Sequence, residues 1–251
     1  MPTAAVQLYS LREAGDLDTQ LALVKEAGFE AVESVATHGL APAEFAARVA
    51  VHGLRVASMH VSLALLEGER ATIVEACRLT GCPLVVMPWL PMGERPSGGA
   101  GWTALGRRLA ALGDTLQREG LRLAYHNHEF EFLRHDGRLA LEWVLDASAP
   151  AQLGWEADLG WIHRAGADAA HWLERYSDRL VAVHVKDVAP NGSAVHEDGW
   201  AVPGQGVLPW AQLLPLAAAR AGLFILEHDR PADPVALLRA GRAFLRERLS
   251  A

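Results

Sequence analysis

Short apolar runs alternate along the chain with longer segments whose apolar positions recur three and four residues apart, and most of those segments end near a glycine. Such runs are typical of strands buried on both faces, and such segments are typical of helices that pack on one side. The pattern predicts strands over residues 4–10, 31–36, 55–62, 84–89, 121–125, 153–159, 180–188 and 224–229. It predicts helices over residues 16–27, 42–53, 67–80, 103–119, 141–147, 167–176, 210–221 and 234–249.

Regular alternation of strand and helix predicts an α/β fold, a single (β/α)8 TIM barrel with one domain over residues 1–251. The structural alternative is a doubly wound open sheet. That fold would more often carry a glycine-rich phosphate turn after the first strand, and residues 9–13 contain no glycine.

Composition narrows the class of protein. The chain is 51% hydrophobic and 21% charged, as expected for a globular protein with a large core. Its formal net charge of -7 and the lack of a long basic run argue against binding nucleic acid. It shows no secretion signal and no apolar run long enough to span a membrane, so we expect a cytoplasmic protein without a membrane partner. Cys77 and Cys82 fit neither a redox pair nor a zinc ribbon and are expected in the core.

Ionisable and polar residues concentrate where the predicted strands end, which is where TIM barrels carry their active sites. Burying an unpaired charge costs several kcal/mol, so these groups must be paired, solvated or bound to a metal. They are Gln7, Tyr9, Glu33, His60, His126, His128, Glu156, Asp158, His184, Lys186, Asp187, Glu227, His228 and Asp229.

Three of these residues form the sharpest set. Asp158, His184 and Glu227 stand on the sixth, seventh and eighth predicted strands, which are neighbours in a barrel. Mixed oxygen and nitrogen ligands suit one divalent metal ion, Mn, Mg, Co or Zn. Singly, each has a structural explanation: a helix cap for the aspartate, a core position for the histidine, an ion pair with Arg230 or Lys186 for the glutamate. The coincidence of all three on consecutive strands favours a metal site.

The histidine-rich stretch at residues 125–132 (YHNHEFEF) ends the fifth strand. Alternation along a strand directs His126 and His128 to one face and Asn127 to the other. Trp89, Trp161 and Trp200 fall in or beside loops that follow strands, where an indole could stack on a sugar ring or simply pack. The loop over residues 189–208 fits either a lid or plain surface.

The whole chain resembles the sugar phosphate isomerase/epimerase family of xylose isomerase-like barrels, whose relatives include ketose 3-epimerases, inosose and 3-dehydroshikimate dehydratases, and endonuclease IV. The resemblance rests on an ordered set of motifs: residues 125–132, Asp158-Leu159-Gly160-Trp161 with residues 165–168, His184-Val185-Lys186-Asp187, residues 202–206 before Trp210, and Leu226-Glu227-His228-Asp229. In the N-terminal half, Gln7, Tyr9, Ser10, Glu33 and His60 match.

The resemblance implies one divalent metal held by Glu, Asp, His and Glu from strands five to eight. Asp158, His184 and Glu227 match the last three ligands. The usual first glutamate would fall within residues 124–126, where no carboxylate stands. Glu131 is the candidate replacement, with His126 or His128 as the alternative.

The implied reaction is isomerisation or epimerisation of a sugar or keto-sugar by proton transfer through an enediolate. Glu227 or His126 is the expected proton carrier. Lys186 is expected to stabilise the oxyanion, unless it only forms an ion pair with Glu156 or Asp158. His60, His128, Gln7 and Glu33 are the expected substrate-binding residues.

Three other functions are alternatives to isomerisation or epimerisation. A dehydratase or lyase acting on a keto-polyol or 3-keto-glycoside could use the same metal site, and the fifth strand is similar to the inosose dehydratase type. DNA repair would need more metal ligands and a basic face. Carbohydrate binding without chemistry would follow if no metal binds. The expected partner is a small carbohydrate, and a homo-oligomer is compatible with a barrel of this size.

Overall fold

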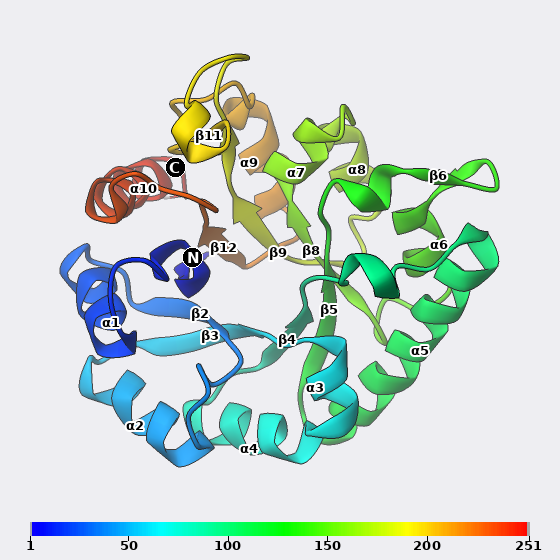
Figure 1. Cartoon of the computed structure of the whole chain (residues 1–251), viewed down its shortest axis with the longest axis horizontal. Helices are drawn as coiled ribbons and strands as arrows, with labels where there is room; N and C mark the ends of the chain where they lie inside the picture. The colour runs from blue at the N-terminus through cyan, green and yellow to red at the C-terminus, as the bar shows by residue number, and fades with distance from the viewer. Residues whose placement is uncertain (1, 250–251) are drawn as a thin grey trace.

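A computed structural model describes residues 2–249 and contains a closed barrel of parallel strands with helices packed around its outside (Figure 1). The strands follow one another around the barrel in chain order and β1 pairs with β12 to close it. They are β1 (Thr3–Gln7), β2 (Ala31–Val35), β3 (Arg55–His60), β4 (Leu84–Met87), β5 (Arg122–His126), β8 (Gly154–Asp158), β9 (Leu180–Val185) and β12 (Leu223–Leu226). The structure confirms the predicted (β/α)8 barrel.

The helices surround the strands as the apolar periodicity predicted (Figure 1). They are α1 (Leu17–Glu26), α2 (Pro42–Val51), α3 (Leu63–Gly68), α4 (Arg70–Thr80), α5 (Gly98–Arg118), α6 (Ala140–Asp146), α7 (Leu159–Arg164), α8 (Ala169–Arg175), α9 (Trp210–Ala218) and α10 (Pro234–Leu249). Among residues 2–249, none of these helices is both long and apolar enough to cross a membrane.

Several predicted boundaries were wrong, for local reasons. The single helix expected over residues 67–80 is two, because Ser62 caps an earlier helix through Leu65 N and the chain breaks at Glu69. Helix α5 begins at Gly98 instead of residue 103. Its first turn is held by Asp136, whose carboxylate accepts a hydrogen bond from Gly99 N at 2.6 Å. The short helix α7 was not predicted, and Asp158 caps it through Trp161 N.

Except for β5, the strands are shorter than predicted at their C-terminal ends, because the chain turns there into loops and helices. Strand β1 stops at Gln7, whose side-chain oxygen accepts a hydrogen bond from Tyr9 N at 3.0 Å and starts a 3-10 helix, η1 (Leu8–Leu11). Strand β9 stops at Val185, so Lys186 lies just past the strand. A separate two-stranded sheet, β10 (Asp187–Val188) with β11 (Trp200–Ala201), follows it.

The interior of the barrel has two layers, because alternate residues of each strand point inward. The lower layer is a separate apolar cluster that contains Ala5, Ala31, Ala57, Leu84, Val86, Ala124, Ala182, Leu223 and Ile225. Two residues further along the strands, the inward positions hold Gln7, Glu33, His126, His184 and Glu227. The fold therefore sets a layer of buried polar groups above a floor of small apolar side chains.

Candidate metal centre and pocket

One carboxylate oxygen holds three histidines at the centre of the polar layer. Glu156 Oε1 lies 2.7 Å from His60 Nε2, 3.1 Å from His126 Nδ1 and 3.1 Å from His184 Nε2. All four side chains are buried. The imidazole nitrogens that donate to Glu156 fix the orientation of each ring, so the second nitrogen of His126 and of His184 is directed away from Glu156.

A second buried carboxylate, Glu33, lies below the histidines. It accepts hydrogen bonds from Gln7 Nε2 at 2.8 Å and Ser58 Oγ at 2.6 Å, and lies 2.7 Å from His184 Nε2. Burial alone would raise the pKa of Glu33, but the His60 and His184 imidazoles hold this pKa well below its usual value. Gln7 and Glu33, expected to bind substrate, are thus placed behind the histidines and do not line the pocket described below.

The ring nitrogens of His126 and His184 that do not contact Glu156 converge with Asp158 and Glu227. Asp158 Oδ2 lies 3.9 Å from His126 Nε2 and 3.9 Å from His184 Nδ1, and His184 Nδ1 lies 2.9 Å from Glu227 Oε2. One ligand atom from each of these four residues falls within 4.8 Å of the others. We call His126, Asp158, His184 and Glu227 the metal group. Three were predicted ligands, and His126 was one of the two histidines, with His128, named as the alternative fourth.

The chemistry of the metal group fits a divalent ion. Asp158 Oδ2 is buried without a hydrogen-bond partner among the described residues, which leaves a carboxylate oxygen free to coordinate. Burial together with nearby cationic groups holds the pKa of His126 well below its usual value, which favours the neutral imidazole that a ligand needs. Although burial would lower the pKa of His184, the carboxylates around it raise that pKa well above its usual value, so a metal would take the place of a proton there. Two nitrogen and two oxygen donors are a common set for zinc and manganese.

Asp158 is the member of the metal group that most needs a cation. Burial raises the pKa of Asp158 to about 7, even though Lys186 Nζ lies 3.6 Å from its Oδ2. A divalent ion at this position would favour the ionised carboxylate. A second possible group, His60, His126, Glu156 and His184, overlaps the first. Its histidine nitrogens already share Glu156 Oε1, so the first group fits an ion better.

Lys186 forms ion pairs, one of the two roles expected for it. Its Nζ lies 2.7 Å from Asp229 Oδ1, 3.2 Å from Glu227 Oε2 and close to the rings of Trp161 and Trp200. Burial alone would lower the pKa of Lys186, but the surrounding carboxylates raise this pKa above its usual value, so the amine is a cation. Gly160 permits this packing, because a Cβ there would lie 2.8 Å from Lys186 O.

Glu131, the first choice for fourth ligand, stands outside both groups. Its carboxylate accepts hydrogen bonds from Tyr125 Oη at 2.7 Å and from His128 N at 2.8 Å, and burial raises the pKa of Glu131 to about 7. These contacts hold the turn that carries His128. The structure therefore gives Glu131 a supporting position behind the pocket.

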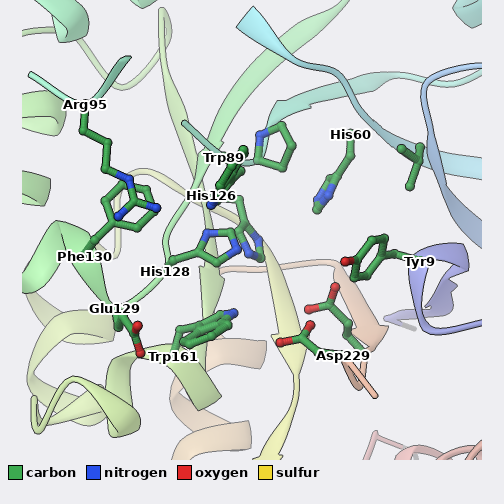
Figure 2. Close-up of a pocket in the computed structure, with 13 residues that line it drawn as sticks. Tyr9, His60, Trp89, Arg95, His126, His128, Glu129, Phe130, Trp161 and Asp229 are labelled. Carbon is green, nitrogen blue, oxygen red and sulfur yellow. The ribbon is translucent and has the colours of Figure 1, made fainter. Parts of the chain in front are cut away.

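A pocket of about 530 Å³ opens over the metal group (Figure 2). Of the predicted site residues, His60, His126, His128 and Glu227 line it, while Asp158, His184 and Lys186 lie beneath. The complete lining is Tyr9, Val35, His60, Pro88, Trp89, Arg95, His126, His128, Glu129, Phe130, Trp161, Glu227 and Asp229.

Sequence reasoning missed several residues of this region. Glu156 was placed among the polar strand ends, but its role at the three histidines was missed, although it precedes Asp158 by two positions and so points into the same barrel interior. Arg95 lies in a loop rich in proline and glycine, with no periodicity to place it. Of the three tryptophans expected near the site, Trp89 and Trp161 line the pocket, whereas Trp200 is fully buried against Lys186.

Asp187 organises the loop over residues 189–208 and lies outside the pocket. Its carboxylate accepts hydrogen bonds from Gly204 N at 2.8 Å, Gly206 N at 3.2 Å, Leu208 N at 3.1 Å and Trp210 Nε1 at 2.7 Å. It also accepts one from Val188 N at 2.9 Å. We call Asp187 and these donors the loop anchor. It explains the glycine-rich motif before Trp210 as a structural feature, because a Cβ at Gly206 would lie 2.2 Å from Asp187 Oδ1.

Comparisons with known proteins agree with this architecture. Residues 21–248 match the family model of the xylose isomerase-like TIM barrel. A sugar phosphate isomerase/epimerase from Parabacteroides distasonis ATCC 8503 superposes with a TM-score of 0.80 at 20% identity, over 98% of each chain. The IolI protein, in a crystal structure with a bound zinc atom, superposes with a TM-score of 0.75 at 16% identity, over 100% of this chain and 98% of that one.

Among curated proteins, inosose dehydratase 1 from Bacillus cereus (strain ZK / E33L) is 25% identical over 164 residues, which are 59% of this chain. The match covers 54% of that protein, so the chain spans only about half the length of the curated relatives it matches. At identities of 20% and below, the solved structures show a shared fold alone.

Proposed function

Because the chain belongs to the xylose isomerase-like TIM barrel family, we propose that it is a divalent-metal-dependent isomerase or epimerase acting on a sugar or keto-sugar. The reaction would move a proton next to a carbonyl through an enediolate. The observation that carries the proposal is the metal group itself, four buried residues that include an Asp158 oxygen without a hydrogen-bond partner among the described residues, next to a pocket of about 530 Å³.

His126, Asp158, His184 and Glu227 would hold the metal. When bound, a divalent ion would polarise a substrate carbonyl and make the neighbouring C–H more acidic. Glu156 supports the site from behind, because its carboxylate keeps the donor nitrogens of His126 and His184 directed at the metal group. The bound metal in IolI supports a metal site in this fold, and the identity of the ion here remains part of the proposal.

Lys186 is proposed to stabilise the negative charge that forms on the substrate, and Asp229 to transfer the proton. Lys186 is a buried cation that can stabilise an oxyanion as it forms. His126 and Glu227, the two residues expected to carry the proton, fall in the metal group. We therefore assign proton transfer to Asp229, a carboxylate outside that group. Asp229 borders the pocket, keeps 24% of its side chain exposed and accepts a hydrogen bond from Lys186 Nζ at 2.7 Å.

The second candidate is a dehydratase or lyase that uses the same metal group. It is favoured by the match to inosose dehydratase 1 and by the Lys186 and Asp229 pair. After proton removal, such a pair could return a proton to a departing hydroxyl or alkoxide. Both candidates begin with the same proton abstraction, and the fate of the next bond separates them.

The proposal is tested in two steps. Elemental analysis of purified protein and manganese titration should show one tightly bound divalent ion per chain. Deuterium from D2O should then enter D-fructose or an inosose next to the carbonyl, as followed by proton NMR. Asp158→Asn should lose the metal and the exchange together. Mass spectrometry of the product separates the candidates, because only a dehydratase forms a product that has lost water.

A matched control keeps the interpretation specific. Asp187→Asn removes the same charge from a neighbouring buried aspartate outside the metal group, so it should retain the metal. A protein that binds no divalent ion, or exchange that persists at full rate in Asp158→Asn, would contradict the proposed function.

A further inference from the structure

Arg95 places a positive charge in the wall of the pocket without an anionic partner. It is the one arginine or lysine among the 13 lining residues. Within residues 2–249, no carboxylate forms an ion pair with it, and its Nε donates to Leu90 O at 3.1 Å. The two terminal nitrogens of the guanidinium, which carry four N–H donors, therefore remain available to a ligand.

The guanidinium is held in place rather than free in solvent. Its central carbon lies 3.6 Å from the ring centre of Phe130 and 5.8 Å from that of Trp89. Phe130 is buried and Arg95 is half-buried, so the cation has lost part of its hydration. A cation that is fixed and partly desolvated gains more from an arriving anion than a mobile surface arginine does.

The acidic side chains of the pocket do not compete for this cation. Glu227 and Asp229 pair with Lys186, and Figure 2 shows Asp229 across the pocket from Arg95 with His126 and His128 between them. Glu129 is exposed and extends toward Trp161 in the same view. Burial raises the pKa of Glu131 and the nearby Arg95 cation partly opposes that rise, but both of its oxygens are engaged by Tyr125 Oη and His128 N. The open donors of Arg95 thus face the pocket from the side remote from Lys186.

We propose that Arg95, stacked on Phe130, binds a carboxylate carried by the substrate at the end remote from its carbonyl. This inference rests on the proposed function and narrows its substrates to sugar acids. A single planar guanidinium matches a carboxylate through two parallel hydrogen bonds. A phosphate dianion would call for further donors, such as a helix N-terminus or a second cation, and the lining supplies no second arginine or lysine.

The test measures affinity by calorimetry on the full manganese-loaded chain with three sugars that differ at one carbon: D-glucose, D-glucuronate and D-glucose 6-phosphate. We expect D-glucuronate to bind about 10-fold more tightly than D-glucose. Arg95→Gln should bring that ratio to about 1, and Arg95→Lys should give an intermediate ratio because it keeps the charge and loses the fork. Arg118→Gln, an exposed arginine on α5, removes the same charge elsewhere and should leave the ratio unchanged.

Equal binding of D-glucose and D-glucuronate, no measurable binding of D-glucuronate, or an unchanged ratio in Arg95→Gln would overturn the carboxylate subsite. Tighter binding of D-glucose 6-phosphate would overturn it in favour of a phosphate. A purely structural arginine would lower the melting temperature in Arg95→Gln and leave the ratio as it was.

The same ratio in Asp158→Asn distinguishes this inference from the proposed function. That variant lacks the metal, so a preference for D-glucuronate that persists there comes from Arg95 and not from coordination. If the wild-type chain catalyses no deuterium exchange but still prefers D-glucuronate to D-glucose, the proposed reaction is refuted and the carboxylate subsite at Arg95 is retained. Exchange with a ratio of 1 would refute the subsite alone.

Discussion

Asp158 and Asp187 are both fully buried and lie at the same rim of the barrel, where Asp158 ends β8 and Asp187 follows its neighbour β9. In the loop anchor, the Asp187 carboxylate accepts hydrogen bonds from four backbone N–H groups and the Trp210 indole. In the metal group, Asp158 Oδ1 accepts one hydrogen bond from Trp161 N at 2.8 Å and Oδ2 accepts none. Equal burial thus accompanies opposite states of hydrogen bonding.

The difference separates structural carboxylates from functional ones. A fully satisfied buried carboxylate stabilises the fold, and its removal leaves donors without acceptors. A buried oxygen without a donor costs stability and persists where the chain uses it for something else. We therefore expect mutations in the loop anchor to reduce stability and leave metal affinity nearly unchanged. Mutations in the metal group should reduce metal affinity and leave the stability of the metal-free protein nearly unchanged.

The largest effect is expected from Asp187→Ala. The change leaves five donors without an acceptor, two of them buried and three partly buried, so the free energy of unfolding should fall by about 4 kcal/mol. Urea unfolding followed by circular dichroism measures the loss. Manganese affinity of the folded variant should stay within about 3-fold of wild type. A variant of wild-type stability that no longer binds manganese would remove the distinction between the two aspartates.

Glu131→Gln extends the comparison to a third buried carboxylate. Burial raises the pKa of Glu131 to about 7, so the folded chain keeps a proton that the unfolded chain releases above about pH 4.5. Glu131 therefore makes the wild-type free energy of unfolding fall as the pH rises from about 4.5 to about 7. The variant lacks this titration, and its fall should be smaller by up to about 3 kcal/mol.

Urea unfolding at about pH 5 and about pH 8 checks the Glu131 prediction, with the exposed Glu129→Gln as the matched control. The same variant decides the fourth ligand. Because Glu131 lies outside the metal group, Glu131→Gln should keep its manganese, and a large loss of metal would restore Glu131 as a ligand.

Asp158→Asn should lower manganese affinity at least about 100-fold, which corresponds to about 2.7 kcal/mol of binding free energy. The variant keeps the side chain's shape and loses the carboxylate oxygen that has no hydrogen-bond partner among the described residues. Without metal, its melting temperature should equal or exceed that of the metal-free wild type, because a buried charge has been removed. Isothermal titration and thermal unfolding in a chelator measure the two quantities, and an unchanged affinity would place the metal elsewhere.

The smallest effect is expected from Glu156→Gln. This residue contacts the histidines of the metal group and not the proposed ion, so manganese affinity should fall about 10-fold. Loss of the negative charge weakens the hold on His126 Nδ1 and His184 Nε2 without removing a ligand. A loss as large as that of Asp158→Asn would indicate that the metal occupies the alternative group around Glu156.

The barrel and the family were predictable because both rest on features that repeat along the chain. Periodic apolar runs and glycine stops gave eight strands in the correct order, and the structure and the family model confirm both. Element boundaries were less predictable, because they depend on contacts distant in sequence. The bond from Gly99 N to Asp136, which marks the start of α5, joins residues 37 positions apart.

The candidate site was predictable only in part, for a related reason. Asp158, His184 and Glu227 could be grouped because neighbouring strands bring their ends together. The choice between Glu131 and His126 depended on how the turn after β5 folds back, and no pattern in residues 125–132 encodes that Glu131 bonds Tyr125. Likewise, nothing in the loop around Arg95 indicates that it stacks on Phe130. The ligand and subsite assignments remain predictions.

The alanines beneath the polar layer decide where this barrel can be redesigned. Ala5, Ala31, Ala124 and Ala182 are fully buried in a packed apolar cluster, so larger side chains there would overpack the barrel interior beneath the site. By contrast, Tyr9, Val35 and Trp89 line the pocket mouth with 39% to 45% of their surfaces exposed. A directed-evolution library for new substrates should therefore randomise the mouth and leave the alanine layer unchanged.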